Sequence, residues 1–291
     1  MRLAIKANYS RLKKIRFKAM LQRIFYFILT LVFVTSCGSS GTSTSNTNTI
    51  TNAVQKIVEP VPAAQNITIN SPDGVVLVGT FSAASKSNSP ALLLLHQWQS
   101  DRHSYDDFAK EMHVAGFNVL AIDGRGFGES TKKTDGTTVA AGRTDADVKA
   151  MLGDVGAALD FLAKQNTVDP KRIGIVGASY GSSLALIYAA DNPKVAAVAL
   201  LSPGLNYFGN MPTEPAIVRI NDRPVFQTAA EDDPDSFNSV TKLSELTSEP
   251  NRAVTVTVKE GGHGTALLKV NAVREPLEKF LKERLGVEPQ K

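Results

Sequence analysis

Cysteine and histidine are scarce in this sequence, and their scarcity excludes several kinds of site. The 291 residues include one Cys and four His. A single Cys allows neither an internal disulfide nor a Cys-based zinc site. The His residues are scattered, and no two of them have the i, i+4 spacing of a helical zinc motif. We therefore expect no catalytic metal and no other cofactor.

Long apolar runs are also missing, and the first 36 residues contain no Asp or Glu. The longest apolar run near the start, residues 24–34, has 11 residues, whereas a membrane-spanning helix needs roughly 20. It follows eight Lys or Arg, which is the order of a secretory signal peptide. Removing these eight charges from the formal net charge of +4 leaves −4. The excess of basic residues thus lies in a leader. Without it, the chain lacks the clustered Lys and Arg that bind phosphates, so we expect no nucleic-acid partner.

The leader ends at the only Cys of the chain. The sequence Val-Thr-Ser-Cys at residues 34–37 resembles the lipobox of bacterial lipoproteins, whose Cys becomes the acylated first residue. The resemblance implies a signal peptide over residues 1–36 and a lipid anchor to a membrane at Cys37. Gly38 stands where a retention Asp would be, which favours the outer membrane, or the cell surface in a monoderm source. Met20 is an alternative start.

After the Cys, the composition indicates a flexible tether and then one folded domain. Residues 38–64 are rich in Ser, Thr, Asn and Gly and show no apolar periodicity. Such a segment buries too little apolar surface to offset the entropy of ordering, so we expect residues 37–64 to link the anchor to the body. From residue 65 to 291, strand-like runs alternate with helical stripes. This alternation predicts one α/β domain with helices on both faces of a mostly parallel sheet.

Eight strands are predicted for that sheet. The first two flank a Pro-Asp-Gly turn at residues 72–74 and are expected to form an antiparallel hairpin. Several of the other runs are apolar on both sides, as in the interior of a parallel sheet. The eight predicted strands are residues 66–70, 75–81, 91–95, 117–122, 172–177, 195–201, 224–228 and 253–258.

A Gly-x-Ser-x-Gly sequence occupies residues 177–181, between a predicted strand and a helical segment. The small residues on either side of Ser179 permit a tight strand-to-helix reversal that exposes the hydroxyl. Here the chain resembles the α/β-hydrolase superfamily, in particular dienelactone-hydrolase-like and esterase members. The resemblance implies an α/β-hydrolase fold with Ser179 as the nucleophile.

A serine nucleophile needs a base and an acid that orients the base. His263 lies in Gly-Gly-His-Gly after the last predicted strand, where hydrolases of this superfamily place their base. The acid is expected after the preceding strand. Asp233 matches the usual turn, with Ala230 in place of its Gly, and Asp232 is the fallback. His103 and His113 are expected to be ordinary imidazoles on or beside a helix.

Two backbone N–H groups are expected to stabilise an oxyanion. One belongs to Tyr180, which follows the nucleophile, and by position the other belongs to Trp98. The loop before Trp98 reads His96-Gln97, whereas the family usually has His-Gly. The side chain of Gln97 could narrow the pocket or add a polar contact, and the donor could shift to Gln97. His96 is expected to brace this loop.

Two further segments bear on the kind of protein. Residues 123–130, Asp-Gly-Arg-Gly-Phe-Gly-Glu-Ser, match the family's Asp-x-Arg-Gly-x-Gly-x-Ser turn and lack the spacing of a dinucleotide fingerprint. We interpret them as a structural turn beneath the site. The connection from residue 201 to 223 is short, which predicts a minimal cap and an open site.

The resemblance implies a serine hydrolase that cleaves carboxylic esters or thioesters through an acyl-enzyme. The expected substrate is a small or polymer-borne acyl group. A peptidase or amidase of the same fold remains an alternative, as does a non-catalytic, membrane-tethered binding lipoprotein.

Overall fold

The computed structural model describes residues 62–247 and 253–287. The expected signal peptide, the anchor at Cys37 and nearly all of the tether lie outside these residues. In the part of the chain that is described, no helix is both long and apolar enough to cross a membrane.

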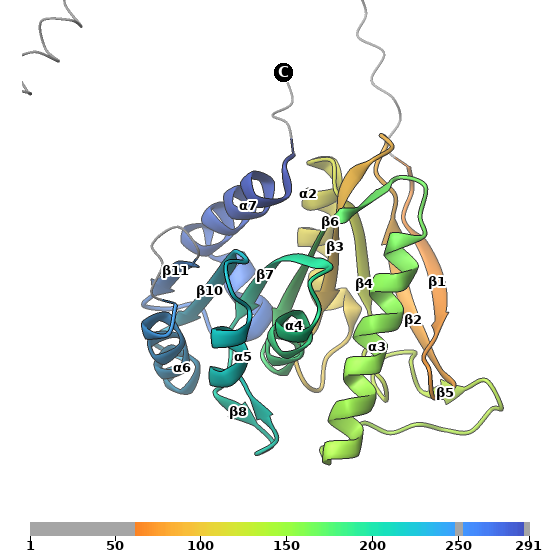
Figure 1. The fold of residues 1–291 in the computed structure, drawn as a ribbon, viewed down its shortest axis with the longest axis horizontal. Helices are drawn as coiled ribbons and strands as arrows, with labels where there is room; N and C mark the ends of the chain where they lie inside the picture. The colour runs from red at the N-terminus through yellow and green to blue at the C-terminus, as the bar shows by residue number, and fades with distance from the viewer. Residues whose placement is uncertain (1–61, 248–252, 288–291) are drawn as a thin grey trace, which may run out of the picture. The chain divides into compact units, whose positions relative to one another are not determined.

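The eight predicted strands are confirmed, and they form one sheet (Figure 1). Its order is β1-β2-β4-β3-β6-β7-β10-β11, and the two-residue strand β5 is added to it by pairing with β2. The β1–β2 and β2–β4 pairs are antiparallel, and all later neighbours are parallel. The strands are β1 Gln65–Asn70, β2 Val75–Ser82, β3 Ser89–Leu95, β4 Asn118–Ile122, β5 Lys132–Lys133, β6 Val168–Ala178, β7 Val195–Leu201, β10 Val225–Ala230 and β11 Ala253–Val258.

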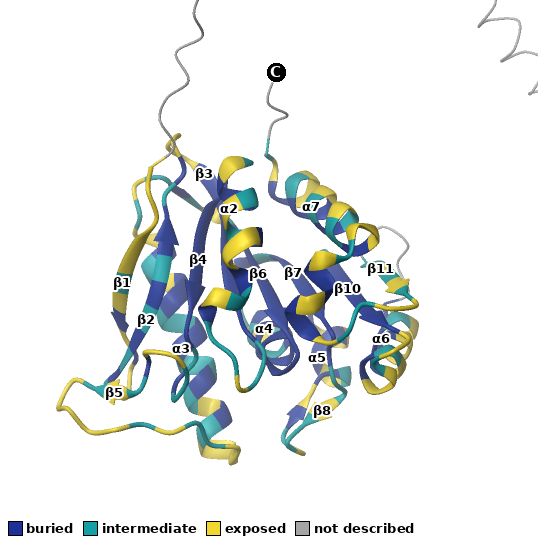
Figure 2. Ribbon diagram, turned by 180° about the vertical axis from the view of Figure 1, so that it is seen from behind, coloured by how far each residue is buried: buried dark blue, intermediate teal, exposed yellow. Residues whose placement is uncertain are grey.

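Helices cover both faces of the sheet, as expected. One face carries α3 Asp145–Ala163, α4 Tyr180–Asp191, α5 Glu214–Arg219 and α6 Pro234–Glu245. The other carries the 3-10 turn η1 Arg102–Tyr105, α2 Asp106–Val114, the 3-10 turn η2 Gly264–Lys269 and α7 Asn271–Leu285. Figures 1 and 2 show these two layers from opposite sides.

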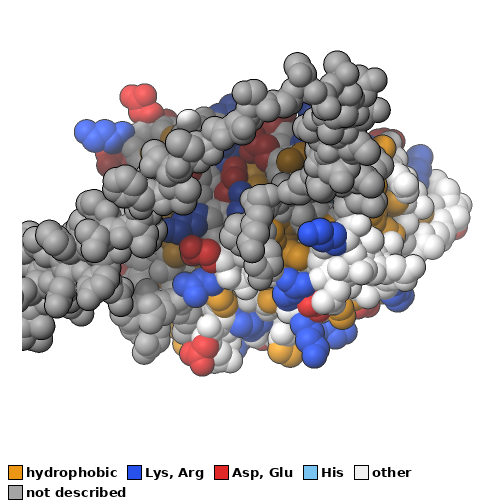
Figure 3. Space-filling model, turned by 90° about the horizontal axis from the view of Figure 1, so that it is seen from above, with side chains coloured by type: hydrophobic (Ala, Val, Ile, Leu, Met, Phe, Trp, Pro, Cys, Tyr) orange, Lys and Arg blue, Asp and Glu red, His pale blue; other side chains and the backbone are white. Residues whose placement is uncertain are grey.

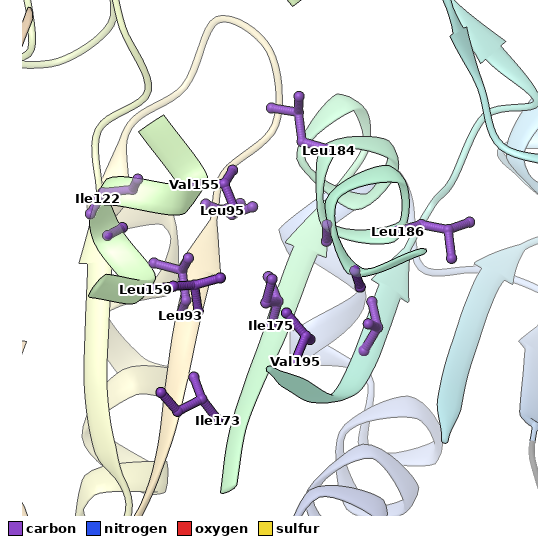
Figure 4. Close-up of a cluster of buried hydrophobic side chains, with 14 of the residues drawn as sticks. Leu93, Leu95, Ile122, Val155, Leu159, Ile173, Ile175, Leu184, Leu186 and Val195 are labelled. Atoms are coloured by element: carbon purple, nitrogen blue, oxygen red, sulfur yellow. The ribbon is translucent and has the colours of Figure 1, made fainter. Parts of the chain in front are cut away.

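The strand sequences explain why the sheet lies at the centre. Every residue of β3, β4 and β10 is buried, because helices cover both of their faces. Between the sheet and the helices α3 and α4, Leu93, Ile175 and Leu186 belong to one continuous apolar cluster (Figure 4). Fully burying each such side chain contributes roughly 1.5–3 kcal/mol. This packing fixes the strand ends from which the functional loops emerge.

The surface carries charges of both signs. Where described residues are visible in Figure 3, Lys and Arg side chains lie beside Asp and Glu and are interspersed with neutral and apolar groups. On α7, Glu278 pairs with Lys282 at 3.0 Å, and Lys279 lies 3.9 Å from Glu283. Such i, i+4 pairs on a helix surface contribute only a few tenths of a kcal/mol each.

A buried ion-pair network holds the turn at residues 123–130. The Arg125 guanidinium donates from Nε and Nη2 to the two carboxylate oxygens of Asp154 on α3, at 2.6 and 2.7 Å. It also donates from Nη1 to Asp73 in the β1–β2 turn at 2.7 Å, and Ser71 donates to Asp154. One arginine therefore ties this turn to a helix and to the initial hairpin.

We expect Arg125→Ala to lower the free energy of unfolding by about 3–5 kcal/mol, because it leaves the buried carboxylate of Asp154 without its cation. Asp73→Asn is the matched control. The Asp73 side chain is 41% exposed, so we expect a loss of no more than about 1 kcal/mol. Urea unfolding at neutral pH measures both changes, and equal losses would contradict the dominance of the Arg125–Asp154 pair.

Candidate active site

Ser179 occupies a strained turn between β6 and α4. Its φ is 54° and its ψ is −123°, values that L-residues rarely adopt. A side chain on Gly177 would meet the backbone of Gly181, and one on Gly181 would lie 2.5 Å from the carbonyl oxygen of Leu95. The two glycines therefore permit a reversal that leaves the Ser179 hydroxyl at the carboxyl edge of the sheet.

The structure brings His263 and Asp233 together across 30 residues of sequence. The Nδ1 atom of His263 lies 2.7 Å from Oδ2 of Asp233. The His263 side chain is 45% exposed, whereas that of Asp233 is only 14% exposed. A carboxylate on Nδ1 orients the ring and leaves Nε2 as the atom able to accept a proton.

Asp232, the fallback acid, has a different set of partners. Its carboxylate accepts hydrogen bonds from the backbone N–H groups of Gly261 and Gly262 at 3.1 Å. It therefore holds the backbone that leads into His263 and does not contact the imidazole. Glu231 and Asp235, on either side of the pair, are exposed.

The two expected oxyanion donors are available for a ligand. Tyr180 opens α4 directly after Ser179, and Trp98 follows β3. Among the residues that the structure describes, neither backbone N–H donates to another protein group. Free backbone N–H groups at the start of a helix favour developing negative charge.

His96 braces the loop after β3, as expected. It is 2% exposed. Its Nε2 accepts from the N–H of Gly124 at 2.9 Å, so its Nδ1 carries the proton and donates to the carbonyl oxygen of Gln97 at 2.7 Å. Burial lowers the pKa of His96, which keeps the imidazole neutral and able to make both bonds.

Gln97 replaces the usual Gly, and its side chain makes a polar contact with the loop of His263. Its Oε1 accepts from the backbone N–H of Thr265 at 3.4 Å. The Gln97 side chain, which the usual Gly would lack, therefore links the loop that carries Trp98 to the loop that carries His263.

The connection after β7 forms a small cap. It contains the hairpin β8 Asn206–Tyr207 and β9 Met211–Pro212, followed by α5. The Tyr207 hydroxyl donates to the carbonyl oxygen of Ser202 at 3.1 Å. Burial raises the pKa of Tyr207, and the side chains of Ser179 and Ser236 oppose this rise. The phenol thus lies beside the candidate nucleophile.

Aromatic rings line the same side of the site. The Trp98 ring contacts those of Phe127, Tyr180 and Phe208, with centroid separations of 4.8, 5.3 and 4.8 Å. The Arg143 guanidinium lies over Trp98, 4.8 Å from the ring centroid. This aromatic cluster provides an apolar wall next to the Trp98 N–H.

A groove of about 910 Å³ reaches His263 from the face covered by α2 and α7. Gln97, His263 and Thr265 are among the residues that line it, together with charged side chains of both signs and apolar side chains from α2 and η2. Across residues 62–247 and 253–287, no group of three or more His, Cys, Asp or Glu side chains is arranged to hold a metal ion. The chemistry available at the site is that of a hydroxyl, an imidazole and a carboxylate.

Ser202 and Tyr207 are not among the site residues that the sequence predicts. Both lie more than 20 residues after Ser179 in a connection that carries no motif. The one local signal is Ser202-Pro203 at the end of a predicted strand, which indicates a turn but not its partners.

Known proteins support this picture of the fold. A family model for the alpha/beta hydrolase fold matches residues 90–249. The uncharacterized protein Rv2307c of Mycobacterium tuberculosis is 31% identical over 144 residues, which are 49% of this chain and 47% of that protein. The thiohydrolase apmlB of Arthrinium phaeospermum is 30% identical over 132 residues, 45% of this chain and 40% of that protein. The chain thus spans less than half the length of these relatives.

Among solved structures, the esterase Pf2001 of Pyrococcus furiosus has a TM-score of 0.64 with this chain. The match covers 77% of this chain and 92% of the esterase at 18% sequence identity. At this identity the likeness shows the fold alone.

The buried, neutral His96 predicts a pH-dependent stability. Burial lowers its pKa despite the opposing effects of Gln97, Asp123 and Asp101, so the unfolded chain binds this proton at a higher pH than the folded chain. The free energy of unfolding should therefore fall as the pH drops below about 6.5, by up to about 1.4 kcal/mol per pH unit.

His96→Gln supplies the comparison, because Gln retains an acceptor for the N–H of Gly124 but does not titrate. We expect the variant to lose stability less steeply between pH 6.5 and 5 in urea unfolding. Parallel slopes for the two proteins would show that His96 does not titrate differently on folding.

Proposed function

This chain belongs to the alpha/beta hydrolase fold family, and we propose that it is a hydrolase that cleaves carboxylic esters or thioesters through an acyl-enzyme on Ser179. The observation that carries the proposal is the 2.7 Å contact between His263 and Asp233, at the sheet edge where the Ser179 turn lies. An esterase among the structural neighbours and a thiohydrolase among the relatives support the choice of acyl substrate.

In the first half of the reaction, the Ser179 Oγ attacks the carbonyl carbon and His263 Nε2 takes the hydroxyl proton. The carbonyl oxygen becomes an oxyanion, which the N–H groups of Tyr180 and Trp98 stabilise. Asp233 keeps the proton of His263 on Nδ1 and stabilises the imidazolium. The tetrahedral intermediate then collapses, and His263 protonates the departing alcohol or thiol.

In the second half, His263 takes a proton from water, and the resulting hydroxide attacks the acyl carbon. A second oxyanion forms on the same two N–H groups. Its collapse breaks the bond to the Ser179 Oγ, which regains its proton from His263, and releases the carboxylic acid.

The small cap supports a short or polymer-borne acyl group as substrate. The β8–β9 hairpin and the six-residue α5 are the only elements between β7 and β10, and the groove beside His263 is open to solvent at the surface. The same triad in the same fold also serves peptidases and amidases. Rates against acyl esters of increasing length, compared with aminoacyl anilides, separate these alternatives.

We also propose that the chain is exported and anchored by a lipid on Cys37. The basic leader, the 11-residue apolar run and the Val-Thr-Ser-Cys sequence support this placement. The hydrolase domain would then act outside the cytoplasm, on the outer membrane or the cell surface.

The proposal predicts that Ser179→Ala reduces kcat for p-nitrophenyl acetate by roughly 10⁶-fold, because the nucleophile is removed. A fluorophosphonate probe should modify wild-type Ser179 and leave the variant unmodified, as judged by tryptic mass mapping. Turnover by the variant above the blank, or modification of another residue only, would contradict the assignment.

The two neighbouring aspartates form a matched pair for a second test. Asp233→Asn should lower kcat by roughly 10⁴-fold, because an amide no longer stabilises the imidazolium or the correct tautomer. Asp232→Asn retains an oxygen for the backbone N–H groups of Gly261 and Gly262, so we expect a change of about tenfold or less. Steady-state kinetics at pH 8 compares them, and the reverse order would make Asp232 the acid.

A further inference from the structure

Ser202, the residue after β7, combines a strained backbone with three hydrogen bonds. Its φ is 50°, in the left-handed region that a non-glycine residue adopts at a cost. The residue is completely buried. Its N–H donates to the carbonyl oxygen of Thr228 at 2.9 Å, its carbonyl accepts from Tyr207, and its Oγ accepts from the N–H of Gly264 at 2.9 Å.

These partners place Ser202 between the nucleophile and the base. The carbonyl oxygen of the preceding residue, Leu201, accepts a hydrogen bond from the backbone N–H of Ser179 at 2.8 Å. The Ser202 hydroxyl accepts from the backbone N–H of Gly264, the residue directly after His263. Ser202 therefore joins the strand end next to Ser179 to the loop that carries the imidazole.

The loop of His263 depends on side chains from other elements. Asp232 holds the N–H groups of Gly261 and Gly262. Gln97 accepts from the N–H of Thr265 at 3.4 Å. Ser202 accepts from the N–H of Gly264 at the shorter distance of 2.9 Å. Both glycines that flank His263 have a positive φ, 67° at Gly262 and 66° at Gly264. The loop has little intrinsic preference for this path, because glycine is conformationally permissive.

The imidazole itself is held weakly by packing. With 45% of its side chain exposed, its position rests on the Asp233 contact and on the backbone that carries it. A base must hold its nitrogen within hydrogen-bond reach of the nucleophile, and small displacements reduce rates strongly.

We propose that Ser202 is a positioning residue for His263: its hydroxyl fixes the backbone at Gly264 and thereby aims the imidazole at Ser179. The proposal rests on the proposed hydrolase function. Ser202 does not contact the substrate, and it tolerates its strained backbone because that conformation directs the hydroxyl to the neighbouring loop.

Two substitutions separate positioning from simple stability. Ser202→Gly and Ser202→Ala both remove the hydroxyl, but glycine adopts a φ of 50° without strain and alanine does not. We expect both variants to lose kcat for p-nitrophenyl acetate to a similar extent, about 10- to 100-fold, with KM changed less than threefold. We expect the urea midpoint to be higher for Ser202→Gly than for Ser202→Ala.

The matched control is Ser183→Ala on α4. This substitution removes a completely buried hydroxyl that has no partner among the described residues, and we expect wild-type kcat. If activity in the Ser202 variants follows the urea midpoint instead of the missing hydroxyl, Ser202 is only structural and the proposal fails.

Crystal structures of the wild type and Ser202→Gly make the test independent of the reaction. We expect the His263 ring to be displaced from Asp233 in the variant, and an unchanged ring would overturn the positioning role. A wild-type protein that a fluorophosphonate does not modify at Ser179 would refute the hydrolase proposal, and the structural comparison would still decide the role of Ser202.

Discussion

The backbone at Ser179 reverses from β6 into α4 in a conformation that a serine adopts only at a cost. That reversal exists because Gly177 and Gly181 leave space where side chains would meet the backbone. Other parts of the site depend on it. The N–H of Tyr180 is free because it opens the helix, and the N–H of Ser179 is held by the end of β7. A strained turn of this kind persists only where surrounding packing determines it, and here the neighbouring strands β3 and β7 are buried except at Ala196.

Support for this arrangement comes from buried polar groups beneath the loops. His96 joins the Trp98 loop to Gly124. Asp123, also completely buried, accepts from the backbone N–H groups of Arg102 and Glu129 at 2.8 Å. A buried carboxylate with several donors and a paired arginine is fully satisfied, so it adds rigidity without an unpaired charge. The loops that carry the candidate site are thus held by side-chain hydrogen bonds as well as by the sheet.

The sequence alone predicts most of this fold, because a strand that helices cover on both faces has an apolar sequence of strand length. The position of β7, residues 195–201, is predicted to the residue, whereas β6 begins at Val168, four residues earlier than its apolar run indicates. Ser179 and His263 are predicted as site residues from local motifs, and their roles stay predictions. The choice between Asp232 and Asp233 needs the structure, since the two differ only in which atoms they reach across 30 residues.

The bonding partners of Gln97, Ser202 and Tyr207 cannot be predicted from the sequence, for a similar reason. Each joins loops that are distant in sequence, and no periodicity or turn chemistry encodes such a pairing. Gln97 is visible in the sequence only as a departure from the usual Gly, and its partner Thr265 lies 168 residues away. Residues that connect the loops of a candidate site can therefore lack any motif, even where the candidate site residues themselves have one.

The two ends of the described domain emerge at the same edge of the sheet. β1 runs in the direction of β4, because each is antiparallel to β2, so Gln65 lies where the parallel strands begin. At the other end of the domain, Arg172 near the start of β6 donates to the carbonyl oxygens of Leu285 and Gly286. Ser179, Asp233 and His263 follow the opposite ends of their strands. Attachment to a bead or a fusion partner through either end would consequently be made at the edge of the sheet opposite to the candidate site.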